Sequence, residues 1–231
     1  MSKKKVCAVI AAAGSGSRMG GVSKPNIKIL GRTLFEYVLS AIEDSFIDEI
    51  VVVCSKDNEE SLKELAKSFN KPIKFVLGGS MRAESIKNGV LASSEDIEII
   101  CAHDCARPFV TREILEDTVN RAIETGASCV CSPVTDTVKY KNPQTNEVTT
   151  LDRSNMFAVQ TPQCFNKRLY LDAVEHASDI YGNFTDETSL LEHFGAKVDY
   201  IVRTEPNMKL TSPSDVALAE AIFKQINVQG D

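Results

Sequence analysis

The sequence predicts an α/β fold: a Rossmann-like, doubly wound and mostly parallel sheet with a β-arm excursion used in dimerisation. Residues 6–126 contain four successive units in which a short apolar run precedes an amphipathic helical pattern. Such alternation is typical of parallel α/β sheets. A run such as "IVVVC" is apolar throughout, as strands covered on both faces must be. Residues 127–165 lack a helical period, which predicts the arm.

The first half of the chain supplies the four strand–helix units in order. We expect strands within residues 6–14, 48–55, 73–79 and 97–108. We expect the helices that follow them within residues 33–45, 58–69, 81–93 and 111–126. The last of these helices should end at Gly126, because glycine readily adopts the left-handed conformation just beyond a helix.

The second half of the chain changes character. Residues 127–165 indicate strands around the polar turn "KNPQTNE", which we interpret as a hairpin tip. A β-arm of this kind, at about residues 136–155, is too small to be stable alone, so it must pack on the parent domain or on another subunit. The remaining elements of the single domain, residues 1–231, are helices within 167–178 and 184–195, a strand within 197–203 and a final helix that Ser212 can cap.

Composition limits the class of protein. The chain has 231 residues, of which 43% are hydrophobic and 25% charged, which is ordinary for a globular domain with its own core. A net charge of −6 argues against a general nucleic-acid surface. The seven cysteines form no C-x-x-C pair, which indicates reduced, buried thiols. No apolar run approaches the ~20 residues of a membrane span, so we expect a soluble, cytoplasmic protein that binds neither membranes nor nucleic acid.

A glycine-rich stretch, "AAAGSGSRMGGVSKP", follows the first strand. Gly14 and Gly16 match the start of a G-x-G-x-x-G fingerprint, but Met19 stands where the third glycine belongs, which argues against dinucleotide binding. The stretch also lacks the G-K-[ST] ending of a P-loop. It still offers backbone N–H groups at a strand end, where anions bind. Arg18 adds a planar cation that suits phosphate oxygens.

Segments along the whole chain resemble one enzyme family. In order they are "AAAGSGSRMG", "GGSMRAES", "HDCARP", "PVTDT", "QTPQCF", "FTDETS" and "NMKLTSPSD". Together they resemble the 2-C-methyl-D-erythritol 4-phosphate cytidylyltransferase family, within the sugar-nucleotidyltransferase superfamily, which serves non-mevalonate isoprenoid precursor synthesis. Ribitol-5-phosphate cytidylyltransferases share many of these segments and remain an alternative. A nucleotide-binding homologue without turnover is a second alternative.

The resemblance implies a reaction and a nucleotide site. A cytidylyltransferase of this family joins CTP and a sugar-alcohol phosphate into a CDP-alcohol and pyrophosphate, with Mg²⁺ or another divalent cation. Arg18 is implied to stabilise charge on the α-phosphate, and Asp104 to bind the metal, unless Asp104 merely pairs with Arg107. The implied nucleotide-binding residues are Ala12, Ala13, Gly14, Ser15, Gly16, Gly78, Gly79 and Ser85.

The resemblance also implies an acceptor site. Its residues are Thr137, Arg153, Thr161, Thr185 and Lys209, with Arg153 and Lys209 counted as catalytic. Family members supply the equivalent of Arg153 across a dimer, which implies a homodimer that forms through the β-arm. CTP and the sugar-alcohol phosphate are both polyanions, so the site must neutralise charge when it brings them together. This requirement explains why cations and hydroxyls dominate the set.

The lysine that follows the glycine stretch departs from the family pattern. Relatives usually have proline and then a catalytic lysine, whereas this chain has Lys24 and then Pro25. Lys24 stands one residue early and Lys28 three residues late. Since an ammonium sits on a long flexible stem, we expect Lys24 to take the catalytic role, with Lys28 as the alternative.

Overall fold

The computed structural model describes residues 3–14, 23–178 and 180–229. Its centre is a seven-stranded sheet in the order β11-β7-β10-β6-β1-β4-β5. These strands are β11 (Asp199–Val202), β7 (Ala127–Pro133), β10 (Phe157–Asn166), β6 (Ile99–Asp104), β1 (Val6–Ala11), β4 (Glu49–Cys54) and β5 (Ile73–Leu77). All are parallel except β10, which runs antiparallel to both of its neighbours. The predicted mostly parallel α/β fold is confirmed.

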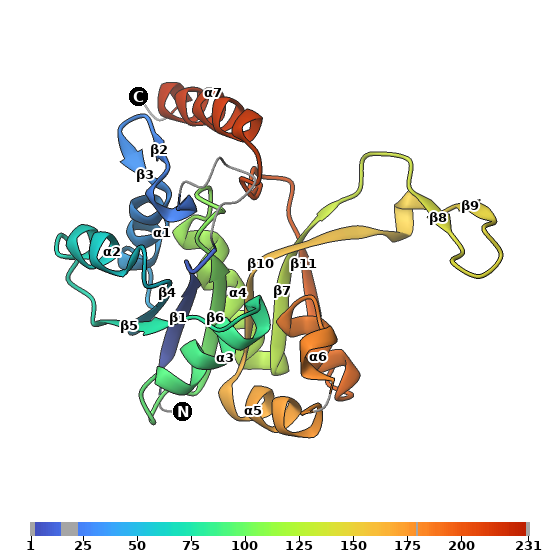
Figure 1. Cartoon of the computed structure of the whole chain (residues 1–231), viewed down its shortest axis with the longest axis horizontal. Helices are drawn as coiled ribbons and strands as arrows, with labels where there is room; N and C mark the ends of the chain where they lie inside the picture. Colours follow the sequence, from blue (N-terminus) through green and yellow to red (C-terminus); the bar gives the residue numbers. More distant parts are fainter. Residues whose placement is uncertain (1–2, 15–22, 179, 230–231) are drawn as a thin grey trace.

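Helices cover both faces of the sheet (Figure 1). One apolar cluster packs the first face under α1 (Leu34–Glu43), α2 (Glu59–Ala66) and α4 (Arg112–Thr125). A second cluster packs the opposite face under α3 (Arg82–Ala92), α5 (Lys167–His176) and α6 (Glu187–His193). The central strands are buried from both sides, and Val6 to Ile10 of β1 are wholly inaccessible. This double burial is the physical reason for their unbroken apolar sequence.

Local sequence signals fix several helix ends as expected. Gly126 ends α4 with a φ of 94°, a left-handed conformation that glycine adopts without steric cost. At α1, Thr33 and Glu36 form a complete capping box. The final helix, α7 (Pro213–Gln229), begins just after Ser212, and Asp215 accepts hydrogen bonds from two backbone N–H groups that precede it.

A smaller third cluster joins the end of the chain to its beginning. Phe223 of α7 stacks on Tyr37 of α1 and on Phe109, with ring centroids 4.3 and 4.4 Å apart. Buried with them is Ile29 of the short strand β2 (Lys28–Ile29), which pairs with β3 (Arg32–Thr33). The 3₁₀ helix η2 (Lys24–Asn26) leads into this pair. These short elements have no sequence period and were not predicted.

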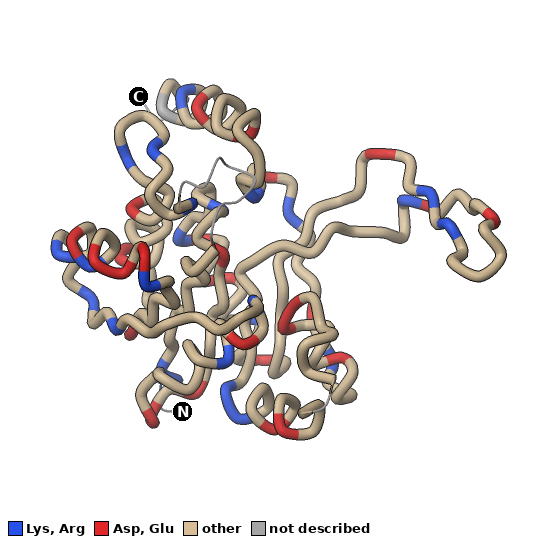
Figure 2. Tube along the Cα trace, in the orientation of Figure 1, with Lys and Arg blue, Asp and Glu red and all other residues tan. Residues whose placement is uncertain are grey.

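The β-arm projects away from the body (Figure 1). Its strands β8 (Lys139–Lys141) and β9 (Val148–Thr150) pair only with each other, and every residue of both is exposed. The 3₁₀ helix η3 (Arg153–Asn155) leads back into β10. Charges of both signs lie along the arm (Figure 2). The arm expected at about residues 136–155 thus carries a two-stranded sheet of its own, separate from the central sheet.

The seven cysteines are buried and none forms a disulfide, as the composition predicted. No helix in the described part of the chain combines the length and the apolar character needed to cross a membrane.

The topology brings several strand ends together at one edge of the sheet. Because β1, β4, β5 and β6 are parallel, their carboxyl ends meet at the same edge of the sheet, where open α/β sheets bind ligands.

We predict that Gly89→Ala destabilises the protein although alanine favours helices. Gly89 lies in α3, where an added Cβ would overlap Val9 of β1 and approach Cγ2 of Val53 in β4 to 2.8 Å. Overpacking of this kind outweighs the propensity gain, so the free energy of unfolding should fall by about 1–2 kcal/mol in urea titrations. Leu91→Ala, at a 57% exposed position of the same helix, should stay within ~0.5 kcal/mol of the parent. A parent-like Gly89→Ala protein would contradict the close approach of α3.

Candidate active site

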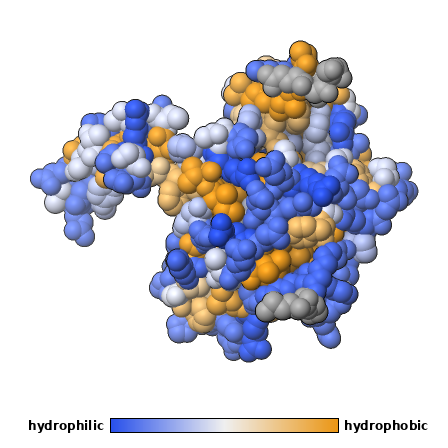
Figure 3. Space-filling model, turned by 180° about the vertical axis from the view of Figure 1, so that it is seen from behind, coloured by the Kyte–Doolittle hydropathy of each residue, from blue (hydrophilic) through white to orange (hydrophobic). Residues whose placement is uncertain are grey.

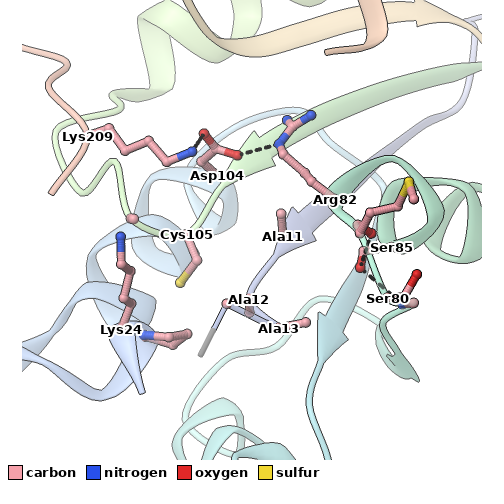
Figure 4. Close-up of a pocket in the computed structure, with 15 residues that line it drawn as sticks. Ala11, Ala12, Ala13, Lys24, Ser80, Arg82, Ser85, Asp104, Cys105 and Lys209 are labelled. Carbon is pink, nitrogen blue, oxygen red and sulfur yellow. Dashed lines mark hydrogen bonds and ion pairs between the residues drawn. The ribbon is translucent and has the colours of Figure 1, made fainter. Parts of the chain in front are cut away.

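A cavity of about 490 Å³ opens at the carboxyl edge of β1 and β6. Five separate stretches of the described chain line it (Figure 4). The lining residues are Ala11, Ala12, Ala13, Gly14, Lys24, Pro25, Gly79, Ser80, Met81, Arg82, Ser85, Asp104, Cys105, Ala106 and Lys209. Most of the nucleotide-binding residues predicted from the sequence and described by the structure are thus brought together in one place.

The first wall is the end of β1 and the start of the glycine stretch. The small residues Ala11 to Gly14 line this wall, and Gly14 is exposed at its end. Asn58, only 1% exposed, donates to the carbonyl of Ala12 and to the hydroxyl of Ser23, both at 2.9 Å. One buried amide therefore ties together the two flanks of the glycine stretch. The predicted residues Ser15, Gly16 and Arg18 lie outside the described residues.

The second wall is the loop between β5 and α3. The Ser85 hydroxyl accepts from the Gly79 N–H at 3.1 Å and donates to the Met81 carbonyl at 3.0 Å. A Cβ on Gly78 would lie 2.7 Å from Cβ of Ala13, so glycine allows this loop to approach the first wall. Gly79 and Ser85 line the described cavity, whereas Gly78 supports it from behind. Ser85 shapes the loop from a buried position.

Asp104 is the charged centre of the cavity. It ends β6, is 5% exposed, and faces three cations: Nζ of Lys209 at 2.8 Å, Nε of Arg82 at 3.1 Å and Nε of Arg107 at 3.7 Å. Burial alone would raise the pKa of this carboxyl, but the three cations, Arg82 foremost, hold the pKa well below its usual range. Asp104 is therefore ionised throughout the physiological pH range. The predicted pairing with Arg107 is present but is the longest of the three.

Neutral polar groups hold the backbone of Asp104 from behind. Its N–H donates to Oγ1 of Thr161 at 3.0 Å, and the same hydroxyl lies 3.1 Å from Nδ1 of His103. Burial lowers the pKa of His103 to about 4, so this ring is neutral at physiological pH. Thr161 is 3% exposed, and its hydroxyl is already used inside the protein. The structure thus places Thr161 behind Asp104, away from the described cavity lining.

The two candidate lysines have different positions. Lys24 lines the cavity, and its Nζ donates to the Leu210 carbonyl at 3.1 Å. Lys28 is exposed on β2 and does not line the described part of the cavity. Leu210 directly follows Lys209 in the chain. The Lys209 side chain therefore pairs with Asp104 while the neighbouring Leu210 carbonyl accepts from Lys24. This arrangement favours Lys24 over Lys28.

The remaining acceptor residues are dispersed within one chain. Lys209 alone lines the cavity, whereas Thr137, Arg153 and Thr185 are exposed elsewhere. Arg153 instead borders a second hollow, of about 560 Å³, at the base of the arm. There it donates to the carbonyl of Thr135. These residues do not form one site in a single chain.

The residues present offer limited ligation for a metal. Among residues 3–14, 23–178 and 180–229, no group of three or more His, Cys, Asp or Glu side chains is arranged to hold a metal ion. Asp104 is a single ionised carboxylate in the cavity, and Mg²⁺ commonly binds through one or two carboxylates together with substrate phosphates and water. The donor set therefore fits Mg²⁺ only when a phosphate ligand supplies most of the oxygens.

Comparison with known proteins identifies the family. The family model described as 2-C-methyl-D-erythritol 4-phosphate cytidylyltransferase matches residues 6–225. Proteins of that name from Clostridium botulinum (strain Langeland) and Clostridium kluyveri are 37% and 39% identical over 230 and 223 residues, covering 98% and 94% of this chain and 100% and 96% of theirs. The chain belongs to this family. It is a nucleotidyltransferase, specifically a cytidylyltransferase.

Solved structures agree with this assignment. The crystal structure of 4-diphosphocytidyl-2C-methyl-D-erythritol synthase from Anaerococcus prevotii superposes with a TM-score of 0.87 at 30% identity, over 96% of both chains. The Thermus thermophilus 2-C-methyl-D-erythritol 4-phosphate cytidylyltransferase gives a TM-score of 0.78 at 28% identity, over 94% of this chain and 98% of that one. The cytidylyltransferase fold therefore extends over nearly the whole chain.

Sequence reasoning missed several residues that shape this cytidylyltransferase cavity. Arg82 seemed indistinguishable from a surface charge, yet it bonds Asp104 and also Glu187, 105 residues further along the chain. Asn58 gave no signal, because its partners lie 46 and 35 residues away. Sequence motifs are recognised from residues close together in the chain. Contacts between residues this far apart in the sequence leave no such local pattern.

We predict that Lys24, rather than Lys28, serves the cytidylyltransferase reaction. Lys24→Ala should lower kcat about 10²–10³-fold, the typical loss on removing one preorganised charge donor. Lys28→Ala should keep nearly full activity, because its side chain lies outside the described cavity lining. Pyrophosphate release by the two purified variants measures both effects, and thermal unfolding checks that each is folded. The reverse pattern would assign the role to Lys28.

Proposed function

We propose that the chain transfers the cytidylyl group of CTP to the phosphate of 2-C-methyl-D-erythritol 4-phosphate and releases pyrophosphate. Family membership supports this reaction, and the names of the relatives favour methylerythritol phosphate over ribitol phosphate. The single structural observation that carries the proposal is the cavity itself. It combines an accessible backbone after β1 with a surplus of cations around one carboxylate.

The chemistry needs positioning and charge neutralisation. A phosphate oxygen of the acceptor forms a bond to the α-phosphorus of CTP, and the bond from that phosphorus to the β-phosphate oxygen breaks. The attacking oxygen is already ionised, so the step requires neither a general base nor a covalent nucleophile. Electrostatic stabilisation of the transferring group is then the main contribution of the protein. The described cavity is lined by Lys24 and Lys209 and by backbone groups suited to that task.

The two sides of the cavity suit different parts of the nucleotide. The N–H groups of Gly79 and Ser80 already donate to Ser85 and Glu84, so we assign the carbonyl groups of this loop to the base and ribose. We assign the backbone of Ala13 and Gly14 to the phosphates, since the Ala12 N–H donates to the Val53 carbonyl. We propose that Lys24 stabilises the negative charge that grows on the α-phosphate. We propose the same role for Arg18, on the basis of the sequence pattern. Lys209 lines the cavity and pairs with Asp104, and we propose that it binds the acceptor phosphate from there.

We propose Mg²⁺, or another divalent cation, as the cofactor. When bound, such an ion neutralises phosphate charge and restrains the triphosphate. Asp104 is the residue that would hold it. The low pKa of Asp104 keeps this carboxylate available as an oxygen ligand, and Lys209 is the partner that such a metal would replace.

We further propose a homodimer in which the arm completes the partner's acceptor site. Three observations support this arrangement. The arm strands are exposed on all sides, Arg153 does not line the described cavity of its own chain, and apolar surface lies beside the base of the arm (Figure 3). The exposed apolar residues on β10 and β11 there are Phe157, Val159 and Val202. A dimer at this base would cover them.

A cytoplasmic location is our proposal as well, and the free, buried cysteines fit it.

Pyrophosphate release across a substrate panel tests the proposed reaction. CTP with 2-C-methyl-D-erythritol 4-phosphate should give the highest kcat/KM, and CTP with ribitol 5-phosphate should give far less. ATP, GTP and UTP with the methylerythritol acceptor test selection of the base. Preference for ribitol 5-phosphate would establish the alternative acceptor. CTP binding without turnover on any acceptor would establish a binding protein instead.

Mixed dimers test the contribution of Arg153 across subunits. We predict that Arg153→Ala and Lys24→Ala are each severely impaired, and that mixing the two under conditions of subunit exchange restores activity. In the mixed dimer, the subunit with intact Lys24 receives an intact Arg153 from its partner, so one complete site forms. Pyrophosphate release before and after exchange measures the recovery. A mixture no more active than its components would place Arg153 in the site of its own chain.

A further inference from the structure

Arg82 connects two acidic residues, Asp104 in the cavity lining and the buried Glu187 at the start of α6. Its Nε lies 3.1 Å from Oδ1 of Asp104, and one terminal nitrogen donates to both oxygens of Glu187, at 2.8 and 3.1 Å. Figure 4 shows the Asp104 carboxylate between the Arg82 guanidinium and the Lys209 ammonium. The result is a continuous series of charges, Glu187–Arg82–Asp104–Lys209, of which the last three line the cavity.

The position of Arg82 is unfavourable for local structure. It is the first residue of α3, where the helix dipole disfavours a cation. Glu187 is also costly, because its carboxylate is 3% exposed and burial raises its pKa despite the opposing effect of Arg82. An apolar pair of similar size would avoid both costs. Such a pair of buried charges beside an active-site carboxylate therefore calls for a functional explanation.

Glu187 is a rigid anchor for the guanidinium. It is the first residue of α6, and its backbone N–H donates to Oε1 of Gln163 at 3.1 Å. The same oxygen accepts from Thr188, while Nε2 of Gln163 donates to Asp186, which caps the helix. Gln163 belongs to β10. The central sheet thus fixes the start of α6, and through Glu187 it fixes the orientation of Arg82.

The planar fork of arginine suits this arrangement. Two separate edges of one guanidinium address Glu187 and Asp104 at once, so the direction of one contact determines that of the other. A lysine ammonium, as a point charge, would not transmit orientation in this way. Lys209 and Arg107 approach the other oxygen of Asp104. Without Arg82, these two cations would pull the carboxylate towards the opposite side of the cavity.

We infer that Arg82 and Glu187 form a positioning pair for the transfer reaction: Glu187 orients Arg82, and Arg82 holds the Asp104 carboxylate in its working direction. The inference rests on the proposed function, since it assigns the pair a role in that reaction. Neither residue needs to contact a reacting atom. Their effect passes through Asp104 to Lys209 and to any cation that Asp104 binds.

Glu187→Gln is the first test, because glutamine keeps the shape and removes the charge. We expect kcat per folded molecule to fall about 10–100-fold, the scale of an ångström-sized misplacement, while KM for CTP changes much less. The matched control is Glu49→Gln. Glu49 is another buried carboxylate, 7% exposed and 3.1 Å from Nζ of Lys74, but it begins β4 at the opposite edge of the sheet. That variant should unfold at a lower temperature and keep its kcat.

A double variant separates positioning from simple stabilisation. Arg82→Met leaves Glu187 buried without its cation, so the unfolding temperature should fall. Adding Glu187→Gln removes the unpaired charge and should restore much of the unfolding temperature, but kcat should stay low. If the pair only stabilised the fold, stability and kcat would recover together.

The possible outcomes are distinct. A parent-like kcat for Glu187→Gln, or recovery of kcat in the double variant, would overturn the positioning pair while the proposed function stands. Absence of pyrophosphate release by the parent protein, with every acceptor in the panel, would overturn the proposed function and this inference with it. A loss of kcat equal to that of the Glu49→Gln control would show that the effect is not specific to the cavity.

Discussion

The ionised carboxylate of Asp104 is the constraint on which the rest of the site depends. A charge at 5% exposure is tolerable only when opposite charges and hydrogen bonds surround it. Parallel strands bring the end of β6 beside the end of β1, but they supply no cations. Those come from the start of α3, from the loop after β6 and from the segment before α7. Satisfying one carboxylate therefore draws three distant parts of the chain to one edge of the sheet.

The same requirement prepares the cavity for a polyanion. The buried network contains the carboxylates Asp104 and Glu187 and the cations Arg82, Arg107 and Lys209. The described network therefore carries a positive surplus before Lys24 is counted. Such a surplus is costly in an empty protein and is relieved when phosphates arrive. The backbone of Ala13 and Gly14 lies in the lining of the same cavity, and backbone N–H groups at such a strand end suit phosphates.

Sequence alone predicted the elements that local rules govern. The apolar runs of β1 and β6, the glycine end of α4 and the capped start of α7 all follow from periodicity and end signals. It did not predict that β10 inserts between β6 and β7, because strand order depends on contacts far apart in the chain. The same limit applies to the site. The motifs identified Asp104, but no pattern of neighbouring residues indicates that Arg82 pairs with Glu187. The role of Arg18 stays a prediction, since it lies outside the described residues.

The local structure accommodates the order of Lys24 and Pro25, which the family resemblance led us to expect reversed. Both residues belong to η2. Proline suits the first turn of a helix because its ring fixes the φ angle, and Pro25 is buried beside the cavity. Ser23, just before them, is held by Asn58, which also holds Ala12. With the backbone fixed on both sides of the glycine stretch, a one-residue change in lysine position need not move the ammonium far, because its flexible stem absorbs the difference. The contact of Nζ with the Leu210 carbonyl shows that the stem spans the distance to the Lys209 segment. The lysine position is therefore set by the anchored backbone around it, and the residue order within η2 matters less than that anchoring.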